Sequence, residues 1–332
     1  MTAPALSAQV QRLTAAGTIT PADVVGLRQA IYPDMTVGPD EAEALVDLDR
    51  ALATRCREWN DLFIEALTDF VVRQQAPVDY IDEAKADWLM SRLAGNGRLN
   101  SDSALEAVVH ILEAATSAPP RLAQFAMAQV KAAVLDGDGP LLQGKLEKGR
   151  VCAAEAALLQ RLLYAAGGDG NVAITRAEAE LLFDINDACR GADNDAAWTG
   201  LFAKALAASV MTVSGFTPVA RDDEARREAW LAHTDPYGYC GIGGFFNRMF
   251  VPRPADAGSL WGDGLDSWRA HNAEVERAQS AAESVTDEEA NWLMYRIGRD
   301  GVLDEAERAL VAFLKAESPD IHPVLRPLLD QV

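Results

Sequence analysis

Cysteine is scarce in this 332-residue sequence, and the few cysteines that occur are scattered. Cys56, Cys152, Cys189 and Cys240 lie far apart and form no CxxC pair. The sequence therefore lacks a motif of neighbouring thiols for redox chemistry or metal binding. Isolated cysteines of this kind are typical of reduced thiols in a cytoplasm.

Long hydrophobic runs are also missing. No apolar stretch approaches the roughly 20 residues that a membrane-spanning helix requires. The first residues, Met1 to Pro4, lack the basic region and apolar core of a signal peptide. Together with the cysteine pattern, these absences predict a cytoplasmic protein without a membrane span.

Positive charge is in short supply. Lys and Arg number 30 against 50 Asp and Glu, which gives a formal net charge of −20. A field of this sign repels nucleic acid and anionic membrane surfaces, so we expect neither as a partner. It favours cations or a basic protein partner, or else serves solubility alone.

Recognisable catalytic motifs are absent as well. The sequence contains no Ser/His/Asp signature, no HExxH and no paired-carboxylate motif. The run Gly241-Ile242-Gly243-Gly244 does not match the phosphate-binding patterns of Rossmann or P-loop proteins, and no predicted strand precedes it. We therefore expect no cofactor, and the sequence favours a protein without enzymatic activity.

What the sequence does contain is an internal repeat. Three pairs of segments match in the same order: VGPDEAEALVDLDRA from Val37 with ITRAEAELLFDINDA from Ile174, EWNDLFIEAL from Glu58 with AWTGLFAKAL from Ala197, and ADWLMSRLAGNGRLN (86–100) with ANWLMYRIGRDGVLD (290–304). The order predicts a duplicated module, with copies at residues 1–140 and 141–332. The last pair is spaced much further apart than the others, which places an insertion at about residues 213–280 of the second copy.

Two sequence patterns indicate that the repeated unit is helical. An apolar residue, a capping residue, two variable positions and an acid recur, as in Ile19-Thr20-Pro21-Ala22-Asp23 and Ile174-Thr175-Arg176-Ala177-Glu178, and this is the capping-box pattern. Apolar residues then follow at steps of three and four, as at Trp59, Leu62, Phe63, Ala66 and Leu67. No alternating strand pattern is evident. The sequence predicts an all-α fold of short helices paired through tight, glycine-containing turns.

One acidic turn is a candidate metal site. Asp300-Gly301-Val302-Leu303, with Asp304 and Glu307, is similar to the second half of an EF-hand loop, although its first half lacks oxygen ligands. Two interpretations remain open. Either the acids cap helices and the glycines provide left-handed turns, or Asp300, Asp304 and Glu307 bind a divalent cation weakly.

The same segment carries a family resemblance. A helix, then Asp300-Gly301-Val302-Leu303-Asp304-Glu305-Ala306-Glu307, then a second helix resembles the TerB-like tellurite-resistance domain. The resemblance covers about a third of the chain, in pieces. The turn at Asn96-Gly97-Arg98-Leu99 is similar but has Asn for Asp and lacks the Glu, which puts a shared metal site there in doubt. The resemblance implies a helical module linked to metals or stress responses, without known catalysis.

The insertion at 213–280 is rich in aromatic residues and glycine, and long segments of this kind are usually functional. Its aromatic content is too high for ordinary disorder. Three interpretations remain open. The aromatics pack the insertion onto the helices; or they form a patch that docks a protein partner; or His233, Asp235 and Cys240 form a metal or nucleophilic site. The candidate partner-binding residues are Trp230, Tyr237, Tyr239, Phe245, Phe246, Met249 and Phe250.

The sequence thus favours a non-enzymatic, acidic, helical binding or scaffold protein that recognises a protein partner chiefly through residues 213–280. The alternative is a metal-associated stress-response protein, or an enzyme with a site near His233, Asp235 and Cys240. A cleft beside the insertion with a buried acid of raised pKa would favour the enzyme.

Overall fold

The structure is a computed structural model that describes residues 4–136, 149–166, 174–211, 287–297, 302–317 and 323–331. Within these ranges it contains 13 α-helices and one very small sheet, so the all-α prediction is confirmed. The chain divides into two units. The first comprises Met1–Thr212 and Thr286–Val332, and the second, Val213–Val285, lies outside the described residues.

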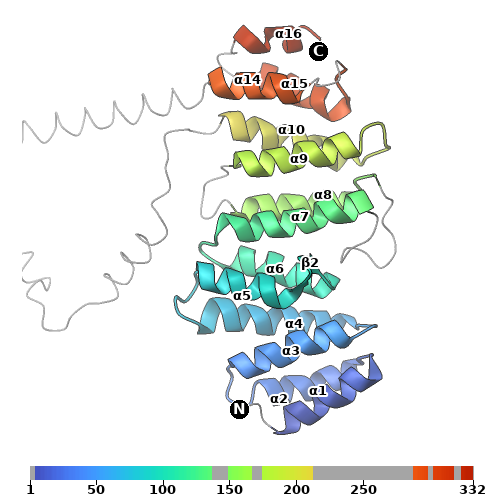
Figure 1. Cartoon of the computed structure of the whole chain (residues 1–332), viewed down its shortest axis with the longest axis vertical. Helices are drawn as coiled ribbons and strands as arrows, with labels where there is room; N and C mark the ends of the chain where they lie inside the picture. Colours follow the sequence, from blue (N-terminus) through green and yellow to red (C-terminus); the bar gives the residue numbers. More distant parts are fainter. Residues whose placement is uncertain are drawn as a thin grey trace, which may run out of the picture. The chain divides into compact units, whose positions relative to one another are not determined.

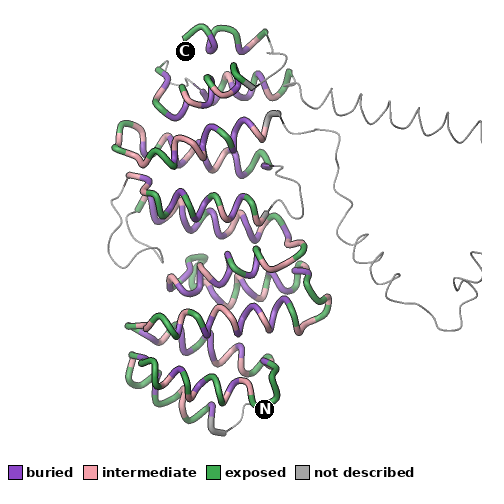
Figure 2. The backbone as a smooth tube through the Cα atoms, turned by 180° about the vertical axis from the view of Figure 1, so that it is seen from behind, coloured by how far each residue is buried: buried purple, intermediate pink, exposed green. Residues whose placement is uncertain are grey.

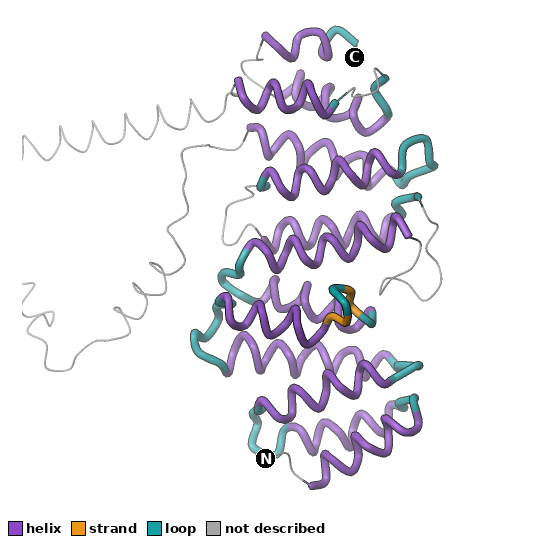
Figure 3. Tube along the Cα trace, viewed as in Figure 1, coloured by secondary structure: helices purple, strands orange, loops and turns teal. Residues whose placement is uncertain are grey.

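The helices of the first unit are short and follow one another closely (Figures 1 and 3). The elements before residue 120 are α1 (Pro4–Ala16), α2 (Pro21–Ile31), α3 (Pro39–Ala51), α4 (Arg57–Thr68), a π-helical turn η1 (Asp69–Gln74), α5 (Glu83–Leu93), β1 (Ala94–Gly95), β2 (Arg98–Leu99) and α6 (Asp102–Ala114). Those after it are α7 (Pro120–Asp136), α8 (Ala153–Ala166), α9 (Arg176–Ala188), α10 (Ala196–Met211), α14 (Asp287–Arg296), α15 (Glu305–Glu317), the 3-10 turn η2 (Pro323–Leu325) and α16 (Arg326–Leu329).

Paired helices are stacked in layers within this unit. From α1 to α8, and again at α10, each described helix packs on the one two places further along: α1 on α3, α3 on α5, α5 on α7 and α7 on α9, and in the second column α2 on α4, α4 on α6, α6 on α8, α8 on α10 and α10 on α15. Figure 1 shows the layers succeeding one another in chain order. Each layer therefore buries its apolar faces against its neighbours, as in helical repeat proteins.

The predicted caps start two of these helices. Thr20 accepts a hydrogen bond from the backbone N–H of Asp23 and the Asp23 carboxylate accepts from the Thr20 N–H, which is a complete capping box at α2. Thr175 and Glu178 form the same arrangement at α9. Each cap stabilises its helix by about 1 kcal/mol. Helix α6 is capped by Ser101, whose hydroxyl accepts a hydrogen bond from the backbone N–H of Ala104.

The apolar face predicted from residue spacing is the core of the first layers. Trp59, Leu62, Phe63, Ala66 and Leu67 are all fully buried. In Figure 2 buried positions recur along the described helices between exposed ones, as amphipathic periodicity requires. Burying one large apolar side chain contributes roughly 1.5–3 kcal/mol to the free energy of folding. This face therefore provides much of the energy that holds α4 in the core.

Two small features complete the fold. The sheet pairs Ala94 with Leu99 and Gly95 with Arg98. Asn96 (φ +53°) and Gly97 (φ +77°) join its strands in the left-handed region, as a two-residue hairpin turn requires, so the structure adds a minimal hairpin where we expected only a turn. Among the described helices none is both long and apolar enough to cross a membrane.

Candidate functional site, an ionic network joining α9 to α14 and α15

One face of α9 is acidic. Glu180, Asp184 and Asp187 are spaced by four and three residues, so their side chains lie on the same side of the helix. Leu182 on the opposite face is buried in the core, and Phe183, which lies beside the acidic side chains, is buried as well. Three like charges along one face repel each other, so the arrangement needs cations from elsewhere in the chain.

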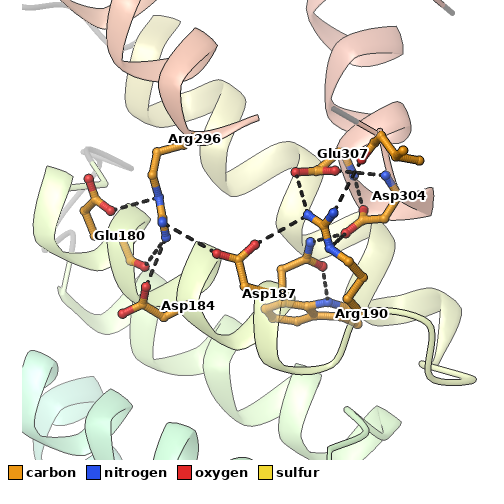
Figure 4. Close-up of polar contacts among 10 residues, drawn as sticks. Glu180, Asp184, Asp187, Arg190, Arg296, Asp304 and Glu307 are labelled. Atoms are coloured by element: carbon orange, nitrogen blue, oxygen red, sulfur yellow. Dashed lines mark hydrogen bonds and ion pairs between the residues drawn. The ribbon is translucent and has the colours of Figure 1, made fainter. Parts of the chain in front are cut away.

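Arg296, the last residue of α14, is the main cation on this face (Figure 4). Its Nε lies 3.0 Å from Oε2 of Glu180, Nη2 lies 3.0 Å from Oδ1 of Asp184, and Nη1 lies 3.5 Å from Oδ2 of Asp187. The guanidinium also lies over the ring of Phe183, with 4.9 Å from Cζ to the ring centroid. Because the Arg296 side chain is only 6% exposed, its charge depends on these carboxylates for compensation.

Two further contacts reinforce this end of the network. Trp292 of α14 donates its indole N–H to Oε1 of Glu180 at 2.5 Å. Lys131 of α7 donates to Asp184 at 2.7 Å. Burial alone would raise the pKa of Asp184, but the hydrogen bond from Lys131 and the charges of Lys131 and Arg296 outweigh it and lower that pKa. Asp184 is therefore held as a carboxylate.

The other end of the network lies at the start of α15. Asp304 and Glu307 form a reciprocal cap, in which each backbone N–H donates to the other residue's carboxylate at 2.8 Å. Glu307 is fully buried. Arg190, just beyond the end of α9, lies 3.3 Å from Glu307, 3.8 Å from Asp304 and 3.6 Å from Asp187. Asp187 thereby connects the two ends of the network, as Figure 4 shows.

A buried amide anchors this second end. Asn186 is 2% exposed; its Nδ2 donates to Oδ2 of Asp304 at 2.6 Å, and its Oδ1 accepts the indole N–H of Trp198 at 3.2 Å. Asn186 of α9 therefore links this helix both to α10, through Trp198, and to the start of α15, through Asp304.

Most of the predicted site residues cannot be placed in this geometry. Those outside the described residues are His233, Asp235, Cys240 and Asp300, together with the partner-binding set Trp230, Tyr237, Tyr239, Phe245, Phe246, Met249 and Phe250. Asp304 and Glu307 are described and brought together. Their carboxylates accept hydrogen bonds from backbone, from Asn186 and from Arg190. Within the described ranges no three His, Cys, Asp or Glu side chains form a group that could hold a metal ion.

Comparisons with protein-family models, with curated proteins and with solved structures found no match to this chain. The resemblance to the TerB-like domain therefore stays a prediction. Any functional proposal has to rest on the contacts of the described residues.

Sequence reasoning missed a matching polar cluster in the first half of the chain. Asp49 is 2% exposed and accepts hydrogen bonds from the Trp59 indole at 2.9 Å, from the hydroxyls of Ser101 and Ser103 at 2.5 and 2.7 Å, and from Arg55 Nε at 2.8 Å. The signal was available: in the aligned repeat segments Asp49 falls on Asn186, and both are polar positions on an otherwise apolar helix face.

Proposed function

We propose that this protein is a non-enzymatic helical scaffold that binds a basic protein partner, chiefly through side chains of residues 213–280. The observation that supports it best is the ionic network at the point where the chain returns from that segment. Arg296 contacts carboxylates of α9 that precede it by more than a hundred residues. The helices that precede and follow the segment, α10 and α14, belong to one compact unit.

The chemistry of the network favours a structural role over catalysis. A general acid or base needs a carboxyl that is available to substrate and has a pKa tuned toward neutrality. Asp184 instead has a lowered pKa, and Asp304 and Glu307 are committed to the cap of α15. These groups are suited to fixing helices in place.

We further propose that the frame consists of two related six-helix modules, α1–α6 and α7–α15. Five packing pairs of the first module have counterparts in the second: α1 on α2 and α7 on α8, α1 on α3 and α7 on α9, α2 on α4 and α8 on α10, α3 on α4 and α9 on α10, α4 on α6 and α10 on α15. On this proposal the boundary falls between α6 and α7, about 20 residues before the residue 140 expected from the sequence.

Equivalent side-chain contacts support the same proposal. The Trp59–Asp49 hydrogen bond matches the Trp198–Asn186 hydrogen bond. The ion pair of Arg92 with Glu43 occupies the positions that Arg296 and Glu180 occupy in the aligned segments.

The partner's charge follows from the composition. With a net charge of −20, long-range attraction speeds association with a basic protein and slows association with nucleic acid. In the proposed complex the aromatic side chains at Phe245, Phe246 and Phe250 make the apolar contacts with the partner. The negative charge of the helical frame attracts the basic partner over longer distances.

Native mass spectrometry of protein purified from its own cells without chelator tests this proposal. We expect a co-purifying basic protein that is lost in the Phe245→Ser/Phe246→Ser variant and retained in Tyr164→Ser, a control at an exposed aromatic residue of the frame. A stoichiometric metal that disappears in His233→Ala/Cys240→Ala, with no protein bound, would replace the scaffold by the metal-associated alternative.

A further inference from the structure

A hollow lies between α8 and α10. It has a volume of about 290 Å³, roughly the space that ten water molecules fill in bulk liquid. Its buried lining is apolar and includes Leu163, Ile174 and Ala205. Its exposed lining includes Gln160, Tyr164 and Lys204. The hollow therefore combines apolar surface with a few polar groups, as the binding sites of small molecules do.

Helices α8 and α2 have the same register. In α2 the carboxylate of Asp23 accepts the backbone N–H of Thr20 at 3.1 Å, and in α8 the carboxylate of Glu155 accepts the N–H of Cys152 at 2.7 Å. Counting along the two helices from these acids places Tyr164 on Tyr32. The buried residues of the two helices then coincide as well: Val24 with Ala156, Leu27 with Leu159 and Ile31 with Leu163.

The same place in the first half of the chain is occupied by two polar pairs. The residues at the positions of Gln160, Tyr164, Lys204 and Ala208 are Arg28, Tyr32, Glu65 and Asp69. Arg28 donates from Nη1 to Oε1 of Glu65 at 3.0 Å and from Nη2 to Oε2. The hydroxyl of Tyr32 donates to Asp69 at 3.0 Å. Burial, that hydrogen bond and the charges of Asp69 and Glu65 raise the pKa of Tyr32, so both carboxylates act on its hydroxyl.

In the second half both carboxylates are replaced. Lys204 takes the position of Glu65, and Ala208 takes that of Asp69. The hydroxyl of Tyr164, a residue that is 56% exposed, has no hydrogen-bond partner among the described residues. The amine of Lys204 forms no hydrogen bond or ion pair with them either, and it carries the one charge in the described lining of the hollow. Two donors therefore lack the carboxylates that their counterparts have.

We propose that this hollow binds a small apolar monocarboxylate. Its carboxylate accepts hydrogen bonds from the Tyr164 hydroxyl and the Lys204 amine, as Asp69 accepts one from Tyr32. Its apolar chain packs on the buried lining between α8 and α10. The inference goes beyond the scaffold proposal and does not depend on it.

The chemistry of the site limits the class of ligand. A hydrogen bond between an ammonium group and a carboxylate is roughly twice as strong as a neutral one, which favours an anion. A single negative charge suits the site best, because the net charge of −20 repels more highly charged anions. Each methylene group that leaves water for the apolar lining should strengthen binding by about fourfold, until the volume is filled.

The test titrates the full chain with octanoate and follows the amide NMR signals of Gly200 and Ala205, which line the hollow. We expect both signals to move and to saturate, while the amide of Asp61, the counterpart of Gly200 in α4, stays in place. Octanamide has the same shape but cannot pair its charge with Lys204, so it should bind about tenfold more weakly. Acetate, which lacks the chain, should move neither signal at the same concentration. No movement of Gly200, or equal responses to octanoate and octanamide, would overturn the proposal.

Three variants at unburied positions make the test specific to the hollow. Lys204→Gln should weaken octanoate binding about tenfold, and Tyr164→Phe should weaken it severalfold. Ala208→Asp introduces the carboxylate that Asp69 provides in the first half, so it should pair with the two donors and abolish binding. Arg57→Gln removes an exposed cation at the start of α4 and is the matched control, which should bind octanoate like the native chain. Native affinity in Lys204→Gln or in Ala208→Asp would contradict the assignment.

Discussion

At the scale of single residues, two arginines at matching positions of similar sequence segments should differ in their effect on stability, because their surroundings differ. Arg296 is 6% exposed and meets three carboxylates of α9. Arg92 is 42% exposed and pairs with Glu43, itself 45% exposed. Water screens both partners of the second pair, whereas the Arg296 guanidinium is withdrawn from water although its carboxylate partners are 35–44% exposed. We therefore attribute the docking of α14 to Arg296 and give Arg92 little weight in stability.

Replacing Arg296 tests this difference. Arg296→Met should lower the free energy of unfolding by about 2–4 kcal/mol, because it removes the cation that the three α9 carboxylates share, while of these three Lys131 and Arg190 still contact only Asp184 and Asp187. Chemical denaturation monitored by circular dichroism gives the value. The matched variant Arg92→Met should cost less than about 1 kcal/mol, as exposed ion pairs do. Equal losses in the two variants would contradict the structural role assigned to the network.

At the scale of helices, the two complete capping boxes have acids of opposite character. The hydroxyl of Thr20 and the guanidinium of Arg12 hold the pKa of Asp23 below its ordinary value of 3.8. Burial raises the pKa of Glu178 above 4.5, although the backbone and side chain of Thr175 act against it. The same local motif therefore depends on pH in opposite directions at α2 and α9.

The signs follow from proton linkage. Above its ordinary pKa of 4.5, folded Glu178 binds a proton more tightly than the unfolded chain, so its contribution to stability falls as pH rises from 4.5 to the raised folded value. Glu178→Gln should thus raise stability at pH 7 by on the order of 1 kcal/mol, with the gain vanishing near pH 4. Thermal unfolding across this pH range measures it.

Asp23 provides the opposite case in the same experiment. Its lowered pKa stabilises the fold above pH 3.8, and that stability is lost as the pH falls through the folded pKa. Asp23→Asn should therefore destabilise the protein by about 1 kcal/mol at pH 7 and by less in acid. A gain at Asp23→Asn, or a loss at Glu178→Gln that grows with pH, would show that burial does not decide the difference.

These helices also show what a sequence can predict. The caps at Thr20 and Thr175 and the apolar face from Trp59 were predictable because each depends on residues within one or two turns. The partners of Arg296 were not, because they belong to a helix more than a hundred residues earlier, and residue spacing does not reveal which helix faces meet. Asp49 was predictable in part. The repeat alignment identifies it as a polar position on an apolar helix face, but only the structure shows that Ser101 and Ser103 donate hydrogen bonds to it.

At the scale of the whole chain, each layer of described helices contributes to the stability of the fold through its packing on the neighbouring layers. Each pair of described helices packs on its neighbours, so the frame is close to a sum of layers and interfaces between them. In the sequence, residues 213–285 lie between α10 and α14, and these two helices belong to successive layers. Contacts of α10 with α15, together with the ionic network, join those layers directly. On the scaffold proposal, the helices are responsible for folding and the segment for recognition.

The most direct test is calorimetric unfolding of a chain in which residues 213–280 are replaced by a Gly/Ser linker. A linker of about 30 residues has a mean span of roughly 30 Å, which lets α14 return without strain. We predict a midpoint within roughly 3 °C of the native chain, the shift that about 1 kcal/mol produces at this size. A much lower midpoint, or loss of the cooperative transition, would mean that the segment is part of the frame and would contradict the division of roles.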